Sequence, residues 1–327
     1  MHDPSNQRVG NVQGRAMNVN GSHSQGQARH QPERVIKSPQ WFSLPPAIRQ
    51  LFSLFPLITY DENELPQRVP NSRHHHTLHI FTINGHELSP NPACLKWQAY
   101  LLAKRIPFTV VSANNHASPS GALPFLLPAQ KSKKEPQPQA IPSSKIQRWA
   151  ESQGAKEETL PIQLEAYMAL IDQNVRNAWL YFLYLRKENF EAVARRLYVE
   201  TASSNTMVQI SLAHQLRSAA QEQLLRTRTH IDEEEIYEAA DAAFKALATA
   251  LGDDSFFSKT ESPNIFDVTL FSYTHLLLSF GRSSQQNSLS WQDSTLLDLL
   301  SRHEKLLHHR KRVLHFCNGD DMTQSTP

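Results

Sequence analysis

The sequence predicts an α+β/α architecture of two unlike halves: a mixed α/β half over residues 78–142, followed by an all-helical half over residues 143–316. Two observations predict this division. Between residues 78 and 128, short strand-like runs alternate with one helix-like stripe. From residue 143 onward, apolar residues recur almost entirely at helical spacing. A charged, proline-rich segment at 129–142 closes the α/β half, and we expect it to be a flexible insertion.

The α/β half opens with the apolar run 78–83, which predicts a buried strand. After a short turn, Asn91 and Pro92 suit the cap and the first position of a helix, where no backbone N–H is needed. The apolar stripe of this helix includes Cys94. The β-branched and aromatic run 107–111 predicts the second strand.

A third strand is predicted within the apolar segment 121–128, which contains Pro124. Because proline cannot donate to a sheet ladder, we expect Pro124 at a strand start, on an edge, or in a cis peptide bond. We keep Pro124 as a candidate for a structural cis-proline. The predicted order of elements is therefore strand, helix, strand and a strand that begins with Leu-Pro. This is the order found in a thioredoxin-like domain.

The helical half begins with one long predicted helix, in which apolar residues keep helical spacing from Leu164 to Leu183. Further helices are predicted at 190–199 and, more polar, at 207–228.

Capping residues set the bounds of the next helix. Asp232 and Glu235 form a capping-box pattern at its start, and Gly252 is expected to end it. The most apolar helix is predicted at 262–280 and belongs in a core, and a last helix is predicted at 295–309.

Three flanking segments are predicted outside the two halves. Residues 1–40 and 317–327 are predicted to be tails, the first of them disordered because it lacks aromatic residues and holds few aliphatic ones. Residues 41–77 form an apolar extension and linker. The extension either packs on its own domain, as the rarity of exposed apolar patches favours, or binds a partner or a membrane surface.

Charge and cysteine content exclude several classes of function. The chain has 33 Lys and Arg against 31 Asp and Glu, so nothing indicates a nucleic-acid partner. Its 2 cysteines lie far apart, which predicts no disulfide framework and suits a reducing compartment. No window reaches the about 18–20 uncharged apolar residues that a membrane-spanning helix needs.

The histidine clusters are not predicted to bind metal. His74, His75 and His76, with His79 nearby, are adjacent side chains that do not converge on one ion, so a solvated linker is expected. The C-terminal histidines are expected on the solvated face of the last helix; they are His303, His308, His309 and His315.

A thioredoxin-like half followed by a helical half is the architecture of glutathione transferases, so catalysis must be considered. Such enzymes need a hydroxyl or thiol after the first strand, activated by a helix N-terminus. Ser89 and Cys94 are the candidates. We expect Cys94 to lie on the apolar face of its helix and Ser89 to be a turn or cap residue.

A second part of the transferase site also departs from the expected pattern. No acid precedes Ser143 and Ser144, where such enzymes hold an acid–serine pair, so the glutathione site looks degraded. We therefore predict no catalytic residue, no metal and no cofactor. A divergent glutathione-dependent transferase that uses Ser89 or Cys94 stays the alternative.

Residues 78–111, which include Asn-Pro-Ala-Cys-Leu at 91–95, resemble the metaxins, as do Ala-Leu-Pro at 122–124 and the helix start at 262–267. Metaxins are catalytically silent relatives of glutathione transferases on the mitochondrial outer membrane. Residues 44–60 further resemble the N-terminal element of the smaller, receptor-type metaxin-like subunit of the fungal sorting and assembly machinery.

The resemblance implies a peripheral protein on the cytosolic face of the mitochondrial outer membrane. It would bind the central β-barrel insertase beside a second metaxin-like subunit and recognise the sorting signal of β-barrel precursors. The resemblance also favours partner binding by the apolar extension. The predicted partner contacts are Trp41, Phe42, Phe52, Phe55, Pro56, Leu57 and Tyr60.

Overall fold

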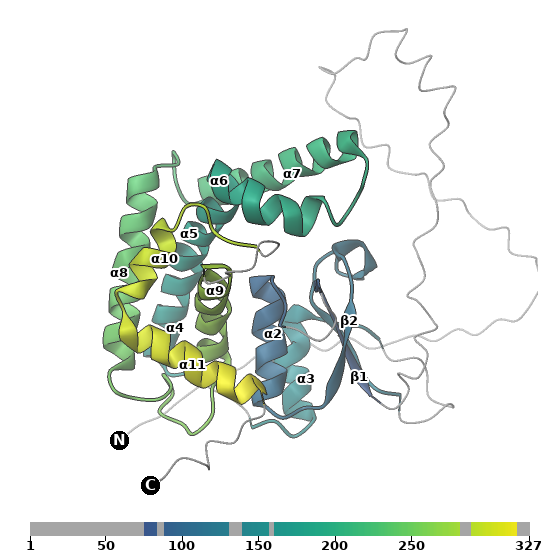
Figure 1. Cartoon of the computed structure of the whole chain (residues 1–327). Helices are drawn as coiled ribbons and strands as arrows, with labels where there is room; N and C mark the ends of the chain where they lie inside the picture. The colour runs from purple at the N-terminus through teal and green to yellow at the C-terminus, as the bar shows by residue number, and fades with distance from the viewer. Residues whose placement is uncertain (1–74, 84–87, 131–138, 157–159, 282–288, 319–327) are drawn as a thin grey trace, which may run out of the picture. The chain divides into compact units, whose positions relative to one another are not determined.

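The α/β half is built on a four-stranded mixed sheet (Figure 1). Its strands are β1 (His76–Ile80), β2 (Phe108–Ser112), β3 (Phe125–Leu127) and β4 (Ile141–Pro142), in the order β2-β1-β3-β4. β1 runs parallel to β2 and antiparallel to β3, and β3 runs antiparallel to β4. β2 therefore lies at one edge of the sheet.

This computed structural model describes residues 75–83, 88–130, 139–156, 160–281 and 289–318. All of them belong to one compact unit that spans Glu62–Pro327. The predicted tail 1–40, the apolar extension and residues 131–138 of the predicted insertion lie outside the described residues.

Two helices belong to the α/β half. The longer, α2 (Pro92–Ala103), begins as predicted: Asn91 caps it by accepting a hydrogen bond from the Cys94 N–H at 3.2 Å, and Pro92 occupies the first turn. The shorter, α3 (Ile146–Ser152), follows β4. The Trp149 ring of α3 contacts the His76 ring of β1 edge-on, so α3 packs against the sheet.

The predicted insertion 129–142 needs a correction. Ala129 donates a backbone hydrogen bond to Nδ1 of His76 at 2.9 Å, and residues 141–142 pair with β3 as strand β4. The α/β half therefore continues past residue 142 to α3. A strand of two residues is too short to give a periodic sequence signal.

The helical half opens with one continuous helical segment, as predicted. It comprises α4 (Ile162–Leu170), a π-helical turn (Ile171–Val175), α5 (Arg176–Leu180) and a second π-helical turn (Tyr181–Leu185). Each π turn widens the helix by one residue, which spacing in the sequence did not reveal.

Three helical segments follow the long segment along the chain. They are α6 (Lys187–Asn189), which continues into a π-helical stretch (Phe190–Val199), then α7 (Thr206–Leu225) and α8 (Glu233–Leu251). The Asp232 side chain caps α8 by accepting a hydrogen bond from the Glu235 N–H at 3.1 Å, as the sequence predicts.

The chain then passes through α9 (Ile265–Gly281), α10 (Thr295–Ser301) and α11 (Glu304–Asn318). The predicted last helix at 295–309 is therefore wrong: two helices meet near Arg302. Residues 317–318 belong to α11 rather than to the predicted tail. None of the described helices combines the length and the apolar composition that crossing a bilayer requires.

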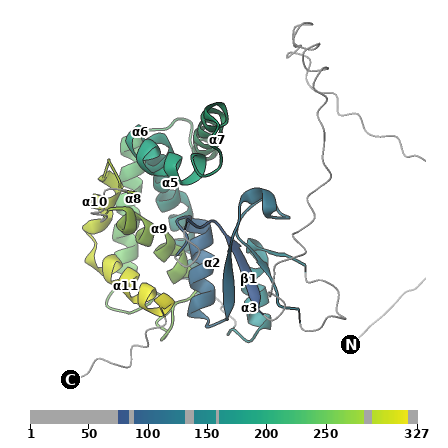
Figure 2. The same ribbon diagram turned by 45° about the vertical axis from the view of Figure 1, so that its right-hand side comes forward.

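The core centres on α9, in which every residue from Ile265 to Leu278 is buried. α9 packs against α2 on one side and α11 on another (Figures 1 and 2). One continuous hydrophobic cluster joins both halves, from Leu78 of β1 through Tyr100 of α2 to Phe271 of α9. The prediction that the most apolar helix lies in a core is confirmed.

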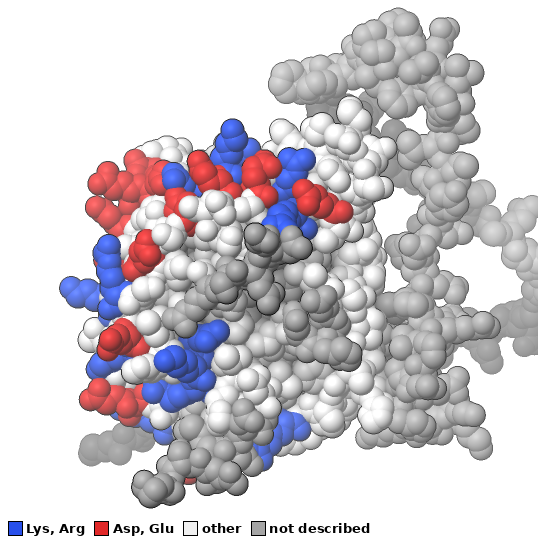
Figure 3. All heavy atoms as spheres, in the orientation of Figure 1, with Lys and Arg blue, Asp and Glu red and all other residues white. Residues whose placement is uncertain are grey.

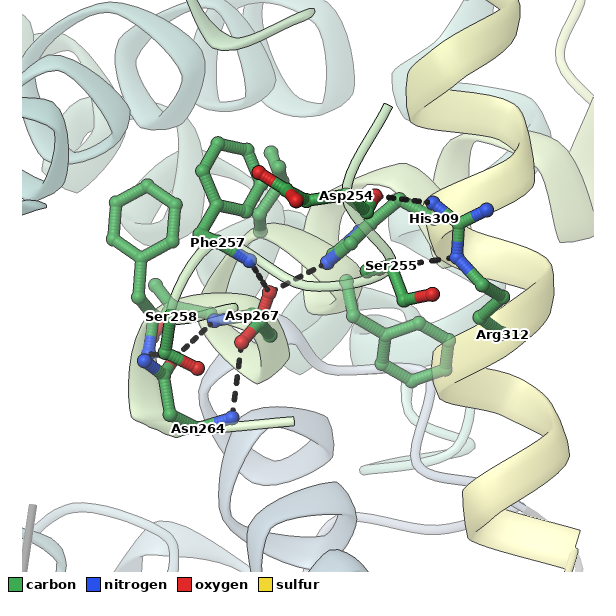
Figure 4. A network of polar contacts seen from close by, with 12 residues as sticks. Asp254, Ser255, Phe257, Ser258, Asn264, Asp267, His309 and Arg312 are labelled. Atoms are coloured by element: carbon green, nitrogen blue, oxygen red, sulfur yellow. Dashed lines mark hydrogen bonds and ion pairs between the residues drawn. The ribbon is translucent and has the colours of Figure 1, made fainter. Parts of the chain in front are cut away.

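A buried polar network fixes the start of α9 (Figure 4). Asp267 is fully buried and accepts hydrogen bonds from the N–H groups of Phe257 and Asn264, both at 3.0 Å. Its Oδ1 also lies 2.9 Å from Nε2 of His309 on α11. Arg312, one turn further along α11, donates to backbone carbonyls of the loop before α9. The network therefore ties three segments together.

Three histidines differ from the sequence prediction. His309 is fully buried rather than on the solvated face, and His79 is buried with its ring stacked on Phe125 at 4.3 Å between centroids. His76 lies within β1 and is only partly exposed. The interpretation of these side chains as a solvated linker and helix face was wrong. Within the described ranges, no group of three His, Cys, Asp or Glu side chains could hold a metal ion.

Candidate functional site

Ser89, one of the two candidate reactive groups, braces the turn before α2. Its side chain is fully buried; the hydroxyl donates to the Phe81 carbonyl at 2.5 Å and accepts from the Asn91 N–H at 3.3 Å. The Ser89 N–H donates to Oε1 of Gln98 at 2.8 Å. The hydroxyl therefore joins the residue after β1 to the cap of α2, and the N–H bonds α2 itself, in keeping with the expected turn role.

Cys94, the other candidate, is also fully buried, in the first turn of α2. Burial raises the pKa of its thiol to about 11, against a smaller opposite effect of hydrogen bonds with the Phe81 backbone and the Ser89 hydroxyl. At neutral pH the thiol stays protonated, whereas nucleophilic cysteine chemistry needs the thiolate.

The segment before β3 holds the predicted proline. The Leu123–Pro124 peptide bond is cis, and Pro124 directly precedes the strand, so two of the three placements that the sequence left open apply. The Leu123 N–H donates to Oδ1 of Asn115 at 3.1 Å. Ser143 and Ser144 lie in a short 3₁₀ turn that leads into α3.

A groove of about 760 Å³ lies where the two halves of the described unit meet. Its lining includes Leu102 of α2, residues 108–110 of β2, Leu276 and Phe280 of α9, and Cys317 near the end of α11. Among the described residues that line it, none is Lys, Arg, Asp or Glu. The groove therefore offers an uncharged surface that is mostly apolar.

The polar groups in this groove are few. His275 of α9 is only 9% exposed, and its Nδ1 has no hydrogen-bond partner in the described part of the chain. Burial, aided by the nearby charge of Arg310, lowers the pKa of His275 to about 3, so the ring is neutral at ordinary pH. Ser279 uses its hydroxyl to bond the His275 carbonyl of its own helix at 2.7 Å.

The backbone of β2 borders the same groove. The Ala113 N–H donates to the Ile80 carbonyl at 2.9 Å, which fixes the side of the strand that faces β1. Because backbone groups alternate sides along a strand, the N–H and C=O groups of Phe108, Val110 and Ser112 point away from β1. No strand among the described residues pairs with this outer edge.

The distribution of charge agrees with the lining. In Figure 3, Lys, Arg, Asp and Glu side chains gather over the helical half, whereas the described surface that is visible around β2 carries none. The edge strand therefore lies in an uncharged region of this face.

The sequence analysis missed this groove because its parts come from four distant segments. The usable local signals were weak: His275 is one of several polar residues in a mostly apolar helix, and the run 108–112 is short. All seven predicted partner contacts, from Trp41 to Tyr60, lie outside the described residues.

Comparison with known proteins adds two domain matches. Residues 92–189 match the glutathione S-transferase N-terminal domain, and residues 240–313 match the glutathione S-transferase C-terminal domain. No sequence among curated proteins matches this chain.

Solved structures with some similarity include a glutathione transferase family member from Pseudomonas fluorescens, described with two glutathione molecules bound. It is 11% identical, with 76% of this chain and 95% of that chain covered and a TM-score of 0.45. A glutathione S-transferase of Ceriporiopsis subvermispora in complex with glutathione is 15% identical, with 75% and 99% covered and a TM-score of 0.45.

The family assignment follows from the two domain matches, which occur in the same order as the α/β and helical halves of the structure. The fold is glutathione-transferase-like, as the sequence predicts: a mixed sheet with helices, followed by an all-helical domain. The chain belongs to the glutathione-transferase-like superfamily.

Proposed function

We propose that this chain is a non-catalytic receptor and assembly subunit of the machinery that inserts β-barrel proteins into the mitochondrial outer membrane. In this proposal it lies at the cytosolic face and binds the β-barrel insertase beside a second metaxin-like subunit. It also recognises the sorting signal of β-barrel precursors.

The observation that carries the proposal is the groove whose described lining is uncharged, beside the edge of β2 with which no described strand pairs. A short peptide signal can be bound in extended form by an exposed strand edge and neighbouring side-chain pockets, without any reactive group. The burial of Ser89 and Cys94 supports a binding role over catalysis, because neither group is accessible to a substrate.

The resemblance of residues 44–60 to a metaxin-like receptor subunit supplies the cellular context. In the proposal, the aromatic and apolar residues of this extension contact the insertase, while the α/β half binds the precursor.

The first test is affinity purification of the protein from mitochondria in mild detergent, followed by identification of the co-purifying proteins. We expect a stable complex with the insertase and a second metaxin-like protein. Recovery of the chain alone would contradict the assembly role.

The extension is tested in the same assay. Replacing Phe52, Phe55 and Tyr60 together with alanine should release the chain from the insertase and leave its circular dichroism spectrum unchanged. Ile162→Ala is the matched control, because Ile162 is an apolar side chain that is 78% exposed outside the extension. Association that survives all the extension substitutions would contradict this role.

The alternative is a divergent glutathione-dependent transferase that uses Ser89 or Cys94, and the two domain matches are compatible with it. The alternative predicts retention on a glutathione matrix that Ser89→Ala abolishes. The receptor proposal predicts no retention of the unmodified chain. The matrix experiment therefore separates the two functions directly.

A further inference from the structure

We propose that the groove between α2, α9 and β2 binds an extended peptide segment of a partner protein, which adds to the outer edge of β2 and places uncharged side chains in the groove. This inference rests on the proposed function, because it assigns a binding site to the precursor signal.

The first argument is the geometry of the strand edge. The N–H and C=O groups of Phe108 and Val110 point outward. These two residues are two positions apart, and the direction of the backbone groups repeats every two residues along a strand. A peptide in extended conformation can bond both residues in register, as in other complexes that form by strand addition. Both residues also line the groove, so a peptide that pairs with the outer edge of β2 would lie along the groove.

The second argument concerns the charge of the peptide. A charged side chain placed in the groove would lose hydration without gaining an opposite charge from the described lining, which is costly. The bound segment must therefore be uncharged where it enters the groove. A volume of about 760 Å³ also lies within the usual range of ligand pockets, so several side chains fit.

The third argument is the partly buried histidine in the lining. Nδ1 of His275 is buried and has no described hydrogen-bond partner, and an unsatisfied buried polar atom costs free energy. A neutral imidazole nitrogen can donate or accept one hydrogen bond, depending on its tautomer. Because His275 lines the groove but its Nδ1 is closed off from solvent, a shift of the ring on binding would let one uncharged polar side chain of the segment bond this nitrogen.

The binding test uses the purified 327-residue chain and a fluorescent synthetic peptide of about eight residues, which lies within the usual range of strand lengths. The peptide alternates apolar and uncharged polar side chains, and a peptide of the same composition in scrambled order serves as its control. Fluorescence anisotropy gives the dissociation constant. We expect the alternating peptide to bind and the scrambled peptide to bind more weakly.

Two pairs of variants locate the site. Val110→Pro removes one outward N–H and should weaken binding by about two- to tenfold. Val110→Thr keeps that N–H and the side-chain shape, so it should weaken binding less than Val110→Pro does. Leu102→Glu places a charge in the groove and should weaken binding by at least about tenfold, whereas the uncharged Leu102→Met should weaken it less. Circular dichroism checks that each variant is folded.

The outcomes separate this inference from the proposed function. Binding by a folded Val110→Pro or Leu102→Glu variant that is weaker than binding by its matched control, Val110→Thr or Leu102→Met, supports the groove. Should Val110→Pro fail to fold, the Leu102 pair decides alone. Binding that both variants leave unchanged overturns the groove and leaves the receptor function standing. If the unmodified chain binds no alternating peptide, both the groove and signal recognition fail, while co-purification with the insertase still tests the assembly role.

Discussion

Asp267 shows how a single residue can hold distant segments together. Its carboxylate is fully buried and lies within hydrogen-bond distance of three nitrogen atoms, from the loop before α9, the start of α9 and α11. A buried carboxylate is tolerated only when such partners replace its lost hydration. Removing the carboxylate leaves these donors buried and unpaired.

We therefore predict that Asp267→Ala lowers the free energy of unfolding by about 3–5 kcal/mol, as breaking a buried polar network does. Urea denaturation followed by circular dichroism measures this change. Asp253→Ala is the control, because Asp253 is a solvent-exposed carboxylate that pairs with Lys305 at the surface. Equal effects of the two substitutions would show that the buried network is not stabilising.

His79 leads to a prediction about pH. Burial lowers the pKa of His79 to about 4 in the folded chain, whereas an unfolded chain has a histidine pKa of about 6.5. As pH falls from about 6.5 to about 4, the unfolded state gains the proton first, so stability falls in this window. His79→Phe keeps an aromatic ring against Phe125 and removes this titration.

The free energy of unfolding of the His79→Phe variant should therefore decrease less over this window than that of the unmodified chain. Denaturation at a series of pH values measures both curves, and other titrating groups contribute to both alike. Parallel curves would refute the role of His79.

The sequence did not reveal the environments of these residues. Leu306, His309 and Val313 share the buried face of α11, and their spacing is helical. Because the sequence analysis ended the last helix at His309, the apolar residue Val313 was not available to define that face. Charged neighbours such as Arg310 then made His309 look solvated.

At the scale of elements, local capping chemistry was the most reliable guide. The helix ends predicted from capping residues are the ones observed, at Asn91, Asp232 and Gly252. Capping depends on a few neighbouring backbone groups, so the local sequence is enough to predict it. Gly252 has φ +59°, a conformation that side chains disfavour. Of the predicted capping box, the hydrogen bond from the Glu235 N–H to the Asp232 side chain is present. The Glu235 carboxylate lies 3.3 Å from a guanidinium nitrogen of Arg228.

We predict that Asp232→Ala destabilises the chain by about 1 kcal/mol, because the first turn of α8 loses its side-chain acceptor. Asp232→Asn should restore most of this loss, since asparagine caps helices equally well. Thermal and urea denaturation of the two variants measure the difference. A loss of equal size in both variants would show that charge rather than the cap matters.

Elements without a local signal were missed. The π-helical turns in Ile171–Val175 and Tyr181–Leu185 depend on how their side chains pack, and helical spacing alone does not distinguish them from α-helix. β4 is only two residues long and depends on pairing with β3. Both features are products of tertiary contacts.

For the whole molecule, the order of strand and helix patterns was sufficient to predict the fold class. The groove was not predictable, because it needs β2, α2, α9 and the end of α11 to meet. The two halves also share a single core, in which α2 packs against α9 and α11. The Tyr198 hydroxyl adds a hydrogen bond from the helical half to the Pro90 carbonyl at 3.4 Å.

We therefore predict that the α/β and helical halves unfold in one cooperative transition. Hydrogen exchange at increasing denaturant, followed by mass spectrometry, should show α2 and α9 losing protection at the same denaturant concentration. Loss of protection in α2 well before α9 would mean that the α/β half unfolds as a separate unit.

The state of the two cysteines makes the chain a convenient subject for chemical labelling. Cys94 is buried, and burial raises the pKa of the partly exposed Cys317 thiol to about 12, which favours slow reaction of both with a maleimide at neutral pH. A cysteine introduced at the exposed position Thr109, on the rim of the groove, would then carry a fluorophore or cross-linker almost alone. Proteins that bind near the groove could be trapped from that position with both native cysteines left in place.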